Sequence, residues 1–321
     1  MPRGIAVVGP TTAGKSAVAA ALAARIAVEI ISVDSRQVYR GLDIGTAKPT
    51  ADDRRAISHH GIDLVDPDER YSAGRFARDA RRWFAEIERR DRVPVLVGGT
   101  GFFLRALTHP MFREPPLPAD AREPLRGYLG ALPEAERLRW LDALDPESAA
   151  KLGKGGGEQR QARALEVALL SGRPLSWWQM KAPGGAGLPL LVCAVDAAQD
   201  ELAARIRRRF EAMIAAGLPE EVRALAGRWG TDAPAFRTTG YAEFIPWLDG
   251  AVGLEEAAEA AIAATRRLAR RQRTWFRHQL PRDTVRLDGT VAPARNAERI
   301  VAAWQNATAR PQGRPEEGHS A

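Results

Sequence analysis

The chain has 321 residues, of which 45% are hydrophobic, enough to bury at least one sizeable core. Its 47 basic and 40 acidic residues give a formal net charge of +7, which favours a polyanionic partner only weakly because the two signs are interspersed. No apolar run approaches the roughly twenty residues of a membrane span, and no signal-peptide pattern precedes the first strand signal. We therefore expect a globular cytoplasmic protein without a membrane partner.

The chain begins with an apolar run at 5–8, the motif Gly-Pro-Thr-Thr-Ala-Gly-Lys-Ser at 9–16 and a helical pattern through residue 26. A phosphate loop between a strand and a helix is the context in which this motif is informative. Its backbone N–H groups would bind phosphate oxygens, Lys15 would supply a positive charge and Ser16 would reach Mg²⁺. The predicted diphosphate or triphosphate site consists of Gly9, Pro10, Thr11, Thr12, Ala13, Gly14, Lys15 and Ser16.

Strand and helix signals alternate over the first hundred residues. Strand-like runs occur at 28–34, 62–65 and 93–97, and Ser72 is placed to cap a helix between the last two. This alternation predicts an α/β fold with a doubly wound parallel sheet, like that of P-loop proteins. A further strand is expected at 188–195, followed by helices at 200–218, 219–229, 254–280 and 292–304.

Two stretches rich in proline or glycine, 110–118 and 183–189, enclose a segment with only helical signals. The simplest arrangement is an all-helical domain inserted into the α/β core through two linkers. The predicted boundaries are 1–116 and 184–309 for the core, 117–183 for the insertion and 310–321 for a disordered tail.

The single cysteine, Cys193, lies in the strand-like run at 188–195. One thiol excludes an internal disulfide and fits a reducing compartment. A lone thiol within an apolar strand is typical of packing, so we expect Cys193 to be buried and to take no part in chemistry.

Asp34 and Thr100 each follow a predicted strand, Thr100 within a Gly-Gly-Thr-Gly loop at 98–101. Ligands of an open parallel sheet bind at the carboxyl ends of its strands, so both residues should lie beside the phosphate loop. Asp34 could hold Mg²⁺ through water or accept a proton or hydrogen bond from a nucleophile, and a turn cap is the structural alternative. The pattern does not choose between the two functional roles.

The helix predicted at 254–280 carries four arginines spaced so that their guanidinium groups share one face. Like charges in a row repel one another unless an anion lies across them. Polar and aromatic side chains among them suit contacts with phosphate and with a base or ribose, whereas the alternative is a solvated face with acidic neighbours. The residues are Arg266, Arg270, Arg273 and Arg277, interleaved with Gln272, Trp275 and Phe276.

Two long motifs, Ser-Val-Asp-Ser-Arg-Gln-Val-Tyr at 32–39 and Gly-Thr-Ala-Lys-Pro at 45–49, are more specific than the phosphate loop alone. Together with the loop at 98–101, they resemble the signatures of the tRNA dimethylallyltransferase family, which prenylates the adenine beside the anticodon. The resemblance extends over residues 4–280. Further matching segments are 159–167, 171–175, 239–241 and 265–277.

The resemblance implies transfer of a dimethylallyl group from dimethylallyl diphosphate to the exocyclic amine of adenine at tRNA position 37, giving N6-isopentenyladenosine and diphosphate. The phosphate loop would hold the departing diphosphate, stabilised by Lys15, by Mg²⁺ near Ser16 and by Arg209. Asp34 resembles the family's base, and Thr100 resembles a contact to the same nucleotide, which must flip out to reach them. The implied catalytic residues are thus Asp34, Thr100 and Arg209.

The resemblance also implies that the helical insertion is a tRNA-binding domain and that the anticodon stem-loop is the partner of the protein. We expect a monomer. The residues that match tRNA contacts of the family are Asp34, Ser35, Arg36, Gln37, Thr100, Arg122, Gln159, Arg160, Gln161, Ala162, Arg163, Arg237, Gly240, Tyr241, Arg270, Gln272, Arg273, Trp275 and Arg277.

Three parts of the sequence depart from the family pattern. In the phosphate loop, Thr12, Ala13 and Ser16 stand where Ala, Ser and Thr are usual, which removes one hydroxyl that we expect near the substrate. Ala242 replaces a usual basic residue and so removes an expected phosphate contact. The pair Phe102-Phe103 replaces Leu-Tyr and loses a hydroxyl.

Three rival functions share parts of this pattern. A small-molecule kinase would use the phosphate loop and Asp34 with ATP, but it leaves the basic helix and the insertion unexplained. An adenylate isopentenyltransferase would perform the same chemistry without needing an RNA-binding insertion. A non-catalytic RNA-binding protein would not need Asp34 and Thr100 at the strand ends.

Overall fold

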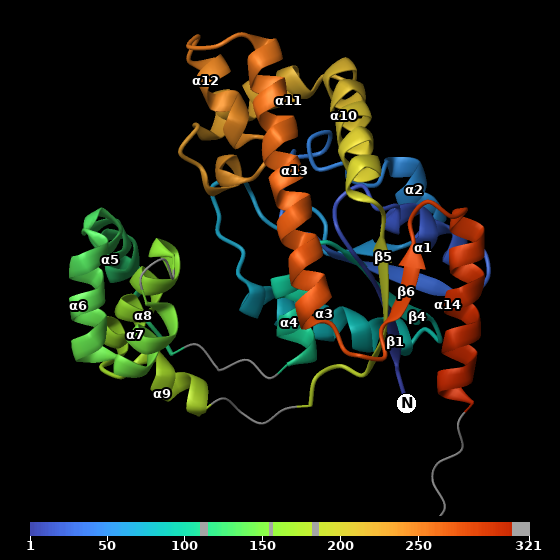
Figure 1. Ribbon diagram of the computed structural model, residues 1–321, viewed down its shortest axis with the longest axis horizontal. Coiled ribbons are helices and arrows are strands. Elements are labelled where there is room, and N and C mark those ends of the chain that lie inside the picture. Colours follow the sequence, from blue (N-terminus) through green and yellow to red (C-terminus); the bar gives the residue numbers. More distant parts are fainter. Residues whose placement is uncertain (110–114, 154–156, 182–185, 310–321) are drawn as a thin grey trace, which may run out of the picture. The chain divides into compact units, whose positions relative to one another are not determined.

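The computed structural model describes residues 1–109, 115–153, 157–181 and 186–309 (Figure 1). The chain divides into two compact units, one made of Met1–Thr108 with Leu188–Ala321 and the other of His109–Gly187. The insertion predicted at 117–183 falls within the second unit. The tail predicted at 310–321 lies outside the described residues. None of the helices in the described ranges combines the length and the apolar character needed to cross a membrane.

In the described part of the first unit, six parallel strands form one sheet in the order β3-β2-β4-β1-β5-β6. β1 lies inside the sheet, with β4 on one side and β5 on the other. The sheet extends on both sides of β1, with β4, β2 and β3 on one side and β5 and β6 on the other, which confirms the predicted doubly wound α/β fold. The strands are β1 (Gly4–Val8), β2 (Val28–Val33), β3 (His59–His60), β4 (Val93–Gly98), β5 (Leu190–Asp196) and β6 (Val285–Asp288).

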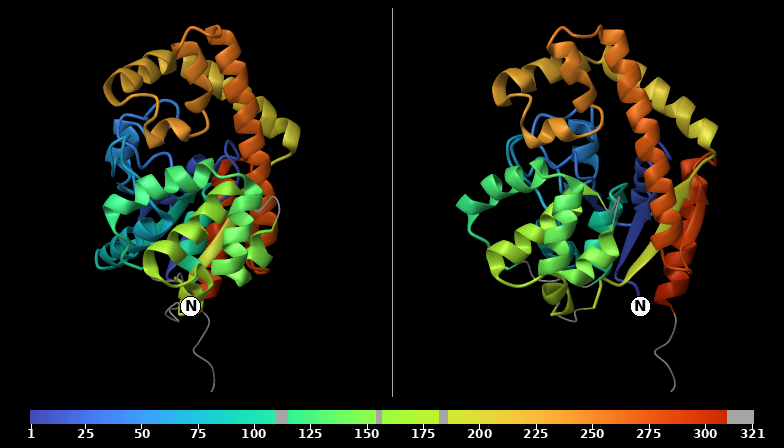
Figure 2. Two further views of the ribbon diagram at one scale, coloured as in Figure 1. Left: turned by 90° about the vertical axis from the view of Figure 1, so that its left-hand side faces the viewer. Right: turned by 60° about the vertical axis from the view of Figure 1, so that its left-hand side comes forward.

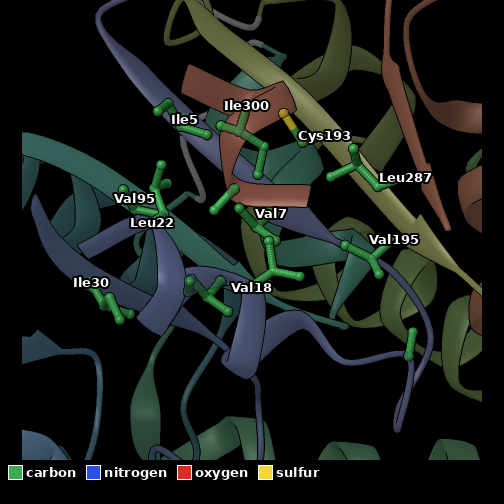
Figure 3. Packing of buried hydrophobic residues seen from close by; sticks show 14 of the residues in the cluster. Ile5, Val7, Val18, Leu22, Ile30, Val95, Cys193, Val195, Leu287 and Ile300 are labelled. Atoms are coloured by element: carbon green, nitrogen blue, oxygen red, sulfur yellow. The ribbon is translucent and has the colours of Figure 1, made fainter. Parts of the chain in front are cut away.

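Helices cover both faces of this sheet (Figure 2). On one face, residues of α1 and α14 pack against alternate strand residues such as Ile5, Val7 and Cys193 (Figure 3). On the other face, α3 packs against β2 and β4. The helices of this unit are α1 (Lys15–Ala23), α2 (Ala51–Ala56), α3 (Ala73–Glu88), α4 (Gly101–Thr108), α10 (Gln199–Ala215), α11 (Leu218–Trp229), α12 (Ile245–Leu248), α13 (Leu254–Gln279) and α14 (Pro293–Thr308), with 3₁₀ turns η1 (Pro234–Arg237) and η2 (Ala242–Phe244).

Two local predictions are confirmed. Ser72 caps α3, because its hydroxyl accepts a hydrogen bond from the backbone N–H of Arg75 at 3.1 Å. Cys193 is fully buried in β5, and this burial raises the pKa of its thiol to about 12. A thiol with such a pKa stays protonated at neutral pH, as a packing role requires.

The strand predicted at 62–65 is wrong. The strand of this region is β3, which lies just before it and pairs with β2. Gly61 and Asp63 have φ values of 83° and 56°, which turn the chain away from the extended conformation. Val65 forms only an isolated bridge with Tyr39. β6 was missed altogether, since four residues at the edge of the sheet carry little periodic signal.

The described residues of the second unit contain only helices and their connections. Its core is formed by Leu129, Leu141 and Leu165, with smaller and half-buried apolar side chains around them. Asp145 is fully buried and accepts hydrogen bonds from the backbone N–H groups of Ser148 and Ser176, which ties the ends of two helices together. The helices are α5 (Ala119–Ala131), α6 (Glu134–Leu144), α7 (Pro146–Leu152), α8 (Glu158–Ser171) and α9 (Leu175–Met180).

Candidate active site

The phosphate loop connects the carboxyl end of β1 to the N-terminus of α1. Gly9 has a φ of 150°, and a Cβ there would lie 2.0 Å from the carbonyl oxygen of Val195, so only glycine fits. Gly14 adopts the left-handed conformation and precedes Lys15, the first residue of α1. The loop therefore ends at a helix N-terminus, whose free N–H groups and dipole favour an anion.

A cavity of about 330 Å³ lies beside this loop, and its described lining comes from the first unit. Five residues of the predicted phosphate site line it: Thr11, Thr12, Gly14, Lys15 and Ser16. Gly9, Pro10 and Ala13 do not line it. The cavity also has an apolar wall that includes Ala19, Ile30 and Val97.

Lys15 is held inside this cavity by a 2.7 Å hydrogen bond from its Nζ to the carbonyl oxygen of Pro10. Burial lowers its pKa to about 7; Asp34 opposes this shift, whereas Arg209 and Arg36 add to it. The negative charge of Asp34 does not fully offset burial and the two arginines. A bound diphosphate would add negative charge and so raise the pKa of Lys15 toward its ordinary value.

Asp34 follows β2 and faces the same cavity. Its Oδ1 accepts hydrogen bonds from the backbone N–H and the Nε of Arg36 at 2.9 and 3.3 Å, and its Oδ2 accepts one from Nη2 at 3.2 Å. Burial alone would raise the pKa of Asp34, but the charge and the hydrogen bonds of Arg36 lower it. The carboxylate is therefore ionised and fixed in orientation.

Thr100 joins the carboxyl ends of β2 and β4. Its backbone N–H donates to the carbonyl oxygen of Val33 at 3.1 Å, and its Oγ1 accepts from the backbone N–H of Ser35 at 3.0 Å. A nucleotide that contacts the Thr100 hydroxyl would thus lie next to Asp34. The structure places Thr100 against Ser35, the neighbour of Asp34; Asp34 lines the cavity, whereas Thr100 is not among its lining residues.

α10 contributes two arginines, one turn apart, to the cavity wall. Arg209 Nη2 donates to the carbonyl oxygen of Thr46 at 3.3 Å; burial lowers the pKa of Arg209 to about 10, with Arg36 adding and Asp34 opposing. Arg205 Nη1 donates to the carbonyl oxygens of Thr12 and Gly289 at 3.3 and 3.0 Å. Sequence reasoning assigned a role only to Arg209, although the spacing of the two residues was a signal for both.

The loop at 43–46 also borders the site, and Glu221 of α11 holds it. Glu221 accepts hydrogen bonds from the backbone N–H groups of Asp43, Ile44 and Gly45 at 2.8 to 3.1 Å. The hydroxyl of Tyr241, a predicted tRNA contact, donates to the same carboxylate at 2.6 Å. Tyr241 is 1% exposed, so it supports this loop from inside and offers no surface to RNA. Sequence reasoning missed Glu221, which carries no motif of its own.

The predicted arginine face of α13 is only partly free. Arg270 and Arg277 are exposed, whereas Arg273 Nε donates to Asp196 Oδ2 at 2.8 Å. Trp275 packs against Gly101, and Phe276 is 4% exposed, so Phe276 cannot stack on a base. An open groove lies beside this face, lined by Arg267, Arg270, Arg271, Thr274 and Trp275.

The remaining tRNA-contact predictions differ in exposure. In η1, Arg237 is exposed, whereas Gly240 is buried and its N–H donates to Glu243. In the second unit, Gln159 and Arg160 are exposed at the start of α8, but Gln161 is fully buried and binds Gly153. Ala162 is also buried. Arg122 and Arg163 both contact the buried carboxylate of Glu166, at 2.9 and 2.8 Å.

One departure from the family pattern has a different meaning in the structure. Ala13 is fully buried and belongs to the apolar cluster beneath the sheet, so a hydroxyl at this position would enter the core and not the cavity. The predicted effect of Ala13 on substrate binding stays a prediction, which the burial of this residue does not support. Ser16, in contrast, lines the cavity.

A phosphate loop beside the central strand of a doubly wound sheet, with Asp34 and two arginines in one cavity, defines a P-loop-like α/β protein. The sequence profile of IPP transferase matches residues 37–279, and that of isopentenyl transferase matches residues 3–62. The chain belongs to the IPP transferase family, an enzyme family of prenyl-group transferases.

Individual relatives agree with this assignment. The tRNA dimethylallyltransferase of Halorhodospira halophila is 46% identical over 280 residues, which cover 86% of this chain and 90% of that protein. The solved tRNA isopentenylpyrophosphate transferase of Bacillus halodurans is 34% identical, with a TM-score of 0.69 and coverage of 95% and 96%. A solved eukaryotic dimethylallyltransferase acting on tRNA is 25% identical, with a TM-score of 0.83 and coverage of 97% and 81%.

Proposed function

We propose that this protein transfers the dimethylallyl group of dimethylallyl diphosphate to the exocyclic amine of adenine at position 37 of tRNA. The products are N6-isopentenyladenosine and diphosphate. The observation that carries this proposal is a single cavity that combines a phosphate loop, an apolar wall and the ionised carboxylate of Asp34. The chain is also 46% identical to a protein named tRNA dimethylallyltransferase.

The two ends of the donor match two parts of the cavity. The diphosphate suits the N-terminus of α1, Lys15 and Arg209, which together supply N–H donors and positive charge. The dimethylallyl group suits the apolar wall at Ile30 and Val97. As the bond between carbon and oxygen breaks, negative charge grows on the diphosphate, and these groups stabilise it more strongly than they stabilise the bound donor.

The acceptor is the adenine amine, whose lone pair is delocalised into the ring. Asp34 accepts a hydrogen bond from this amine and so directs its lone pair toward the allylic carbon. The new bond joins the amine nitrogen to that carbon, and the surplus proton leaves toward Asp34 or water. Because Arg36 lowers the pKa of Asp34, the residue acts mainly as an oriented hydrogen-bond acceptor and only briefly as a base.

Mg²⁺ is the expected cofactor. The described residues hold no cluster of three or more His, Cys, Asp or Glu side chains able to bind a metal ion by themselves. A site with a single protein hydroxyl, that of Ser16, fits Mg²⁺, which commonly keeps several waters and binds through one or two protein groups plus substrate phosphates. Ser16 would hold it through its hydroxyl, together with the diphosphate oxygens, and the ion would neutralise charge on the leaving group.

The RNA partner is the anticodon stem-loop, and the protein acts as a cytoplasmic monomer. Adenine inside a stacked loop cannot enter a cavity of this kind, so it is flipped out before reaction. Exposed Arg270 and Arg277 supply phosphate contacts outside the cavity, while Gln159 and Arg160 supply further polar contacts on the second unit.

The deciding experiment offers the protein an unmodified anticodon stem-loop with dimethylallyl diphosphate and Mg²⁺, and in a parallel reaction with ATP. Mass spectrometry of the RNA should find one dimethylallyl group on adenine 37 and none on a stem-loop with guanine at that position. Release of phosphate from ATP without RNA modification would instead indicate a kinase. Free AMP as acceptor tests the adenylate isopentenyltransferase alternative in the same assay.

A further inference from the structure

The side chain of Gln272 joins two loops of the candidate site. Its Oε1 accepts a hydrogen bond from the backbone N–H of Thr11, in the phosphate loop, at 2.8 Å. Its Nε2 donates to the carbonyl oxygen of Gly99, at the end of β4, at 2.9 Å. Gln272 comes from α13 and lines the cavity between the two loops. Both ends of its amide are therefore occupied by backbone groups of the site.

The glycines after β4 make this contact possible. A Cβ on Gly99 would lie 2.5 Å from Gln272 Nε2, and a Cβ on Gly101 would lie 2.4 Å from the ring of Trp275. Gln272 and Trp275 are three residues apart and so share one face of α13. The Gly-Gly-Thr-Gly loop is thus shaped to receive this helix face, with Thr100 held between the two contacts.

Thr100 extends the connection to the acceptor side of the cavity. It follows Gly99 directly, and its hydroxyl accepts from the N–H of Ser35, the neighbour of Asp34. A continuous path of backbone and hydrogen bonds therefore leads from Thr11, through Gln272, Gly99 and Thr100, to the segment that carries Asp34. One end of the path borders the diphosphate position and the other borders the adenine position.

We propose that Gln272 is a positioning residue, which fixes the separation between the phosphate loop and the loop of Thr100 and thereby the alignment of donor and acceptor. This inference rests on the proposed prenyl transfer. A displacement of about 1 Å between reacting groups can cost about a hundredfold in rate. An amide suits this role because it presents an acceptor and a donor at one end without a charge. The predicted contact of Gln272 with tRNA stays a prediction, and the kinetics below distinguish the two roles.

Substitution of Gln272 by glutamate provides a pH-dependent test. The carboxylate of Gln272→Glu can accept from Thr11 N–H but faces the carbonyl oxygen of Gly99 without a donor. The protonated acid regains that donor and has nearly the shape of glutamine. The ratio of the kcat of Gln272→Glu to that of the wild type should rise as pH falls toward the ordinary glutamate pKa of 4.5. The matching ratio for Gln272→Leu should stay flat.

At neutral pH, kcat of Gln272→Leu should fall by about tenfold to a hundredfold, while its KM for the stem-loop stays within about twofold. Gln305→Glu, on the exposed side of α14, is the control for an added carboxyl and should match the wild type at every pH. A wild-type kcat in Gln272→Leu, or a flat pH ratio in Gln272→Glu, would overturn the proposal. A raised KM for RNA with unchanged kcat would instead indicate that Gln272 contacts RNA.

Calorimetry with inorganic diphosphate separates this inference from the proposed function. Gln272→Leu should bind diphosphate several-fold more weakly than the wild type, because the phosphate loop loses its support at Thr11. If the wild type binds diphosphate but prenylates no RNA, the proposed function fails. The difference in diphosphate affinity between Gln272→Leu and the wild type still tests the contact between Gln272 and Thr11. Equal diphosphate affinity in the two proteins would refute a role for Gln272 in holding the loop.

Discussion

Arg36 and Asp34, two residues apart at the carboxyl end of β2, form a bidentate ion pair, in which Nε of the guanidinium donates to Oδ1 of the carboxylate and Nη2 donates to Oδ2. Both side chains are largely buried, with 13% and 19% of their surfaces exposed. Arg36 lowers the pKa of Asp34 against the effect of burial, so the carboxylate stays charged throughout the physiological range. The pair prepares an oriented acceptor for the adenine amine.

Asp34→Asn should reduce turnover by about a hundredfold or more, because an amide oxygen is a weaker hydrogen-bond acceptor than a carboxylate and cannot take up the proton that leaves the amine. Affinity for the stem-loop should change little, since the shape of the side chain is kept. Single-turnover rates and RNA-binding titrations measure the two quantities. Asp68→Asn, at an exposed position, controls for the loss of a carboxylate. Unchanged turnover in Asp34→Asn would remove this residue from the mechanism.

Arg209→Ala should lower kcat for prenyl transfer by about a hundredfold or more, as expected when a fixed donor to developing negative charge is lost. Arg208→Ala is the matched control, because Arg208 neighbours it on α10 with 64% of its side chain exposed. Steady-state kinetics at saturating dimethylallyl diphosphate make the comparison. Equal losses in both variants would point to general charge effects and not to a contact with the leaving group.

Ser16→Ala should raise the Mg²⁺ concentration for half-maximal activity by about tenfold, whereas Ser16→Thr should leave it nearly unchanged. The reason is that threonine keeps the hydroxyl that lines the cavity and alanine removes it. Initial rates over a Mg²⁺ titration, with chelator as the zero point, provide the measurement. An identical Mg²⁺ dependence in Ser16→Ala would exclude this hydroxyl from the metal site.

Arg270→Ala combined with Arg277→Ala should weaken stem-loop binding and reduce the slope of log affinity against log salt by about 1.5 in total. Both arginines are exposed on α13, unlike Arg273, which is paired with Asp196. Arg82→Ala, on α3, removes an exposed arginine away from that helix and should leave the slope unchanged. A normal slope in the double variant would mean that this face is merely solvated.

Glu29→Gln should destabilise the protein by about 2 kcal/mol at pH 7, because buried Glu29 receives two hydrogen bonds of 2.8 Å from Arg90. These hydrogen bonds lower its pKa below the ordinary 4.5, burial opposes the shift, and His60 adds to it. A lowered folded-state pKa means that the stabilisation is present above about pH 4.5 and is lost as pH falls through the folded value.

Urea unfolding of wild type and Glu29→Gln should therefore give a difference that is largest at neutral pH and shrinks below about pH 4. Glu88→Gln serves as the comparison, because its partner Arg3 has 61% of its side chain exposed and such surface pairs contribute less than about 1 kcal/mol. A difference between Glu29→Gln and wild type that does not vary with pH would show that charge on Glu29 contributes nothing.

Local features of the site could be predicted from the sequence. The phosphate loop and Asp34 directly follow strands, Thr100 follows β4 after one further residue, and a parallel sheet brings its strand ends together whatever else the chain does. The cap at Ser72 likewise depends on residues within one turn of α3. Such features are determined by near neighbours along the chain and by one general rule of sheet geometry.

Features that depend on docking between distant elements could not be predicted. Helical spacing put Arg273 on a basic face of α13 with Gln272 next to it, but it did not say that Arg273 meets Asp196 and that Gln272 meets Thr11. For the same reason, the role of Glu221 was missed. Ala13 shows a related limit, because the motif fixed its place in the loop but not the direction of its side chain.

The contact between Gln272 and Thr11 spans 261 positions of the chain. During synthesis, the phosphate loop leaves the ribosome long before α13 does, and β6 and α14 follow later still. Throughout that interval the N–H of Thr11 lacks its partner on α13. A nascent chain with its phosphate loop already outside the ribosome therefore has no finished cavity, and it gains one only after α13 has emerged as well.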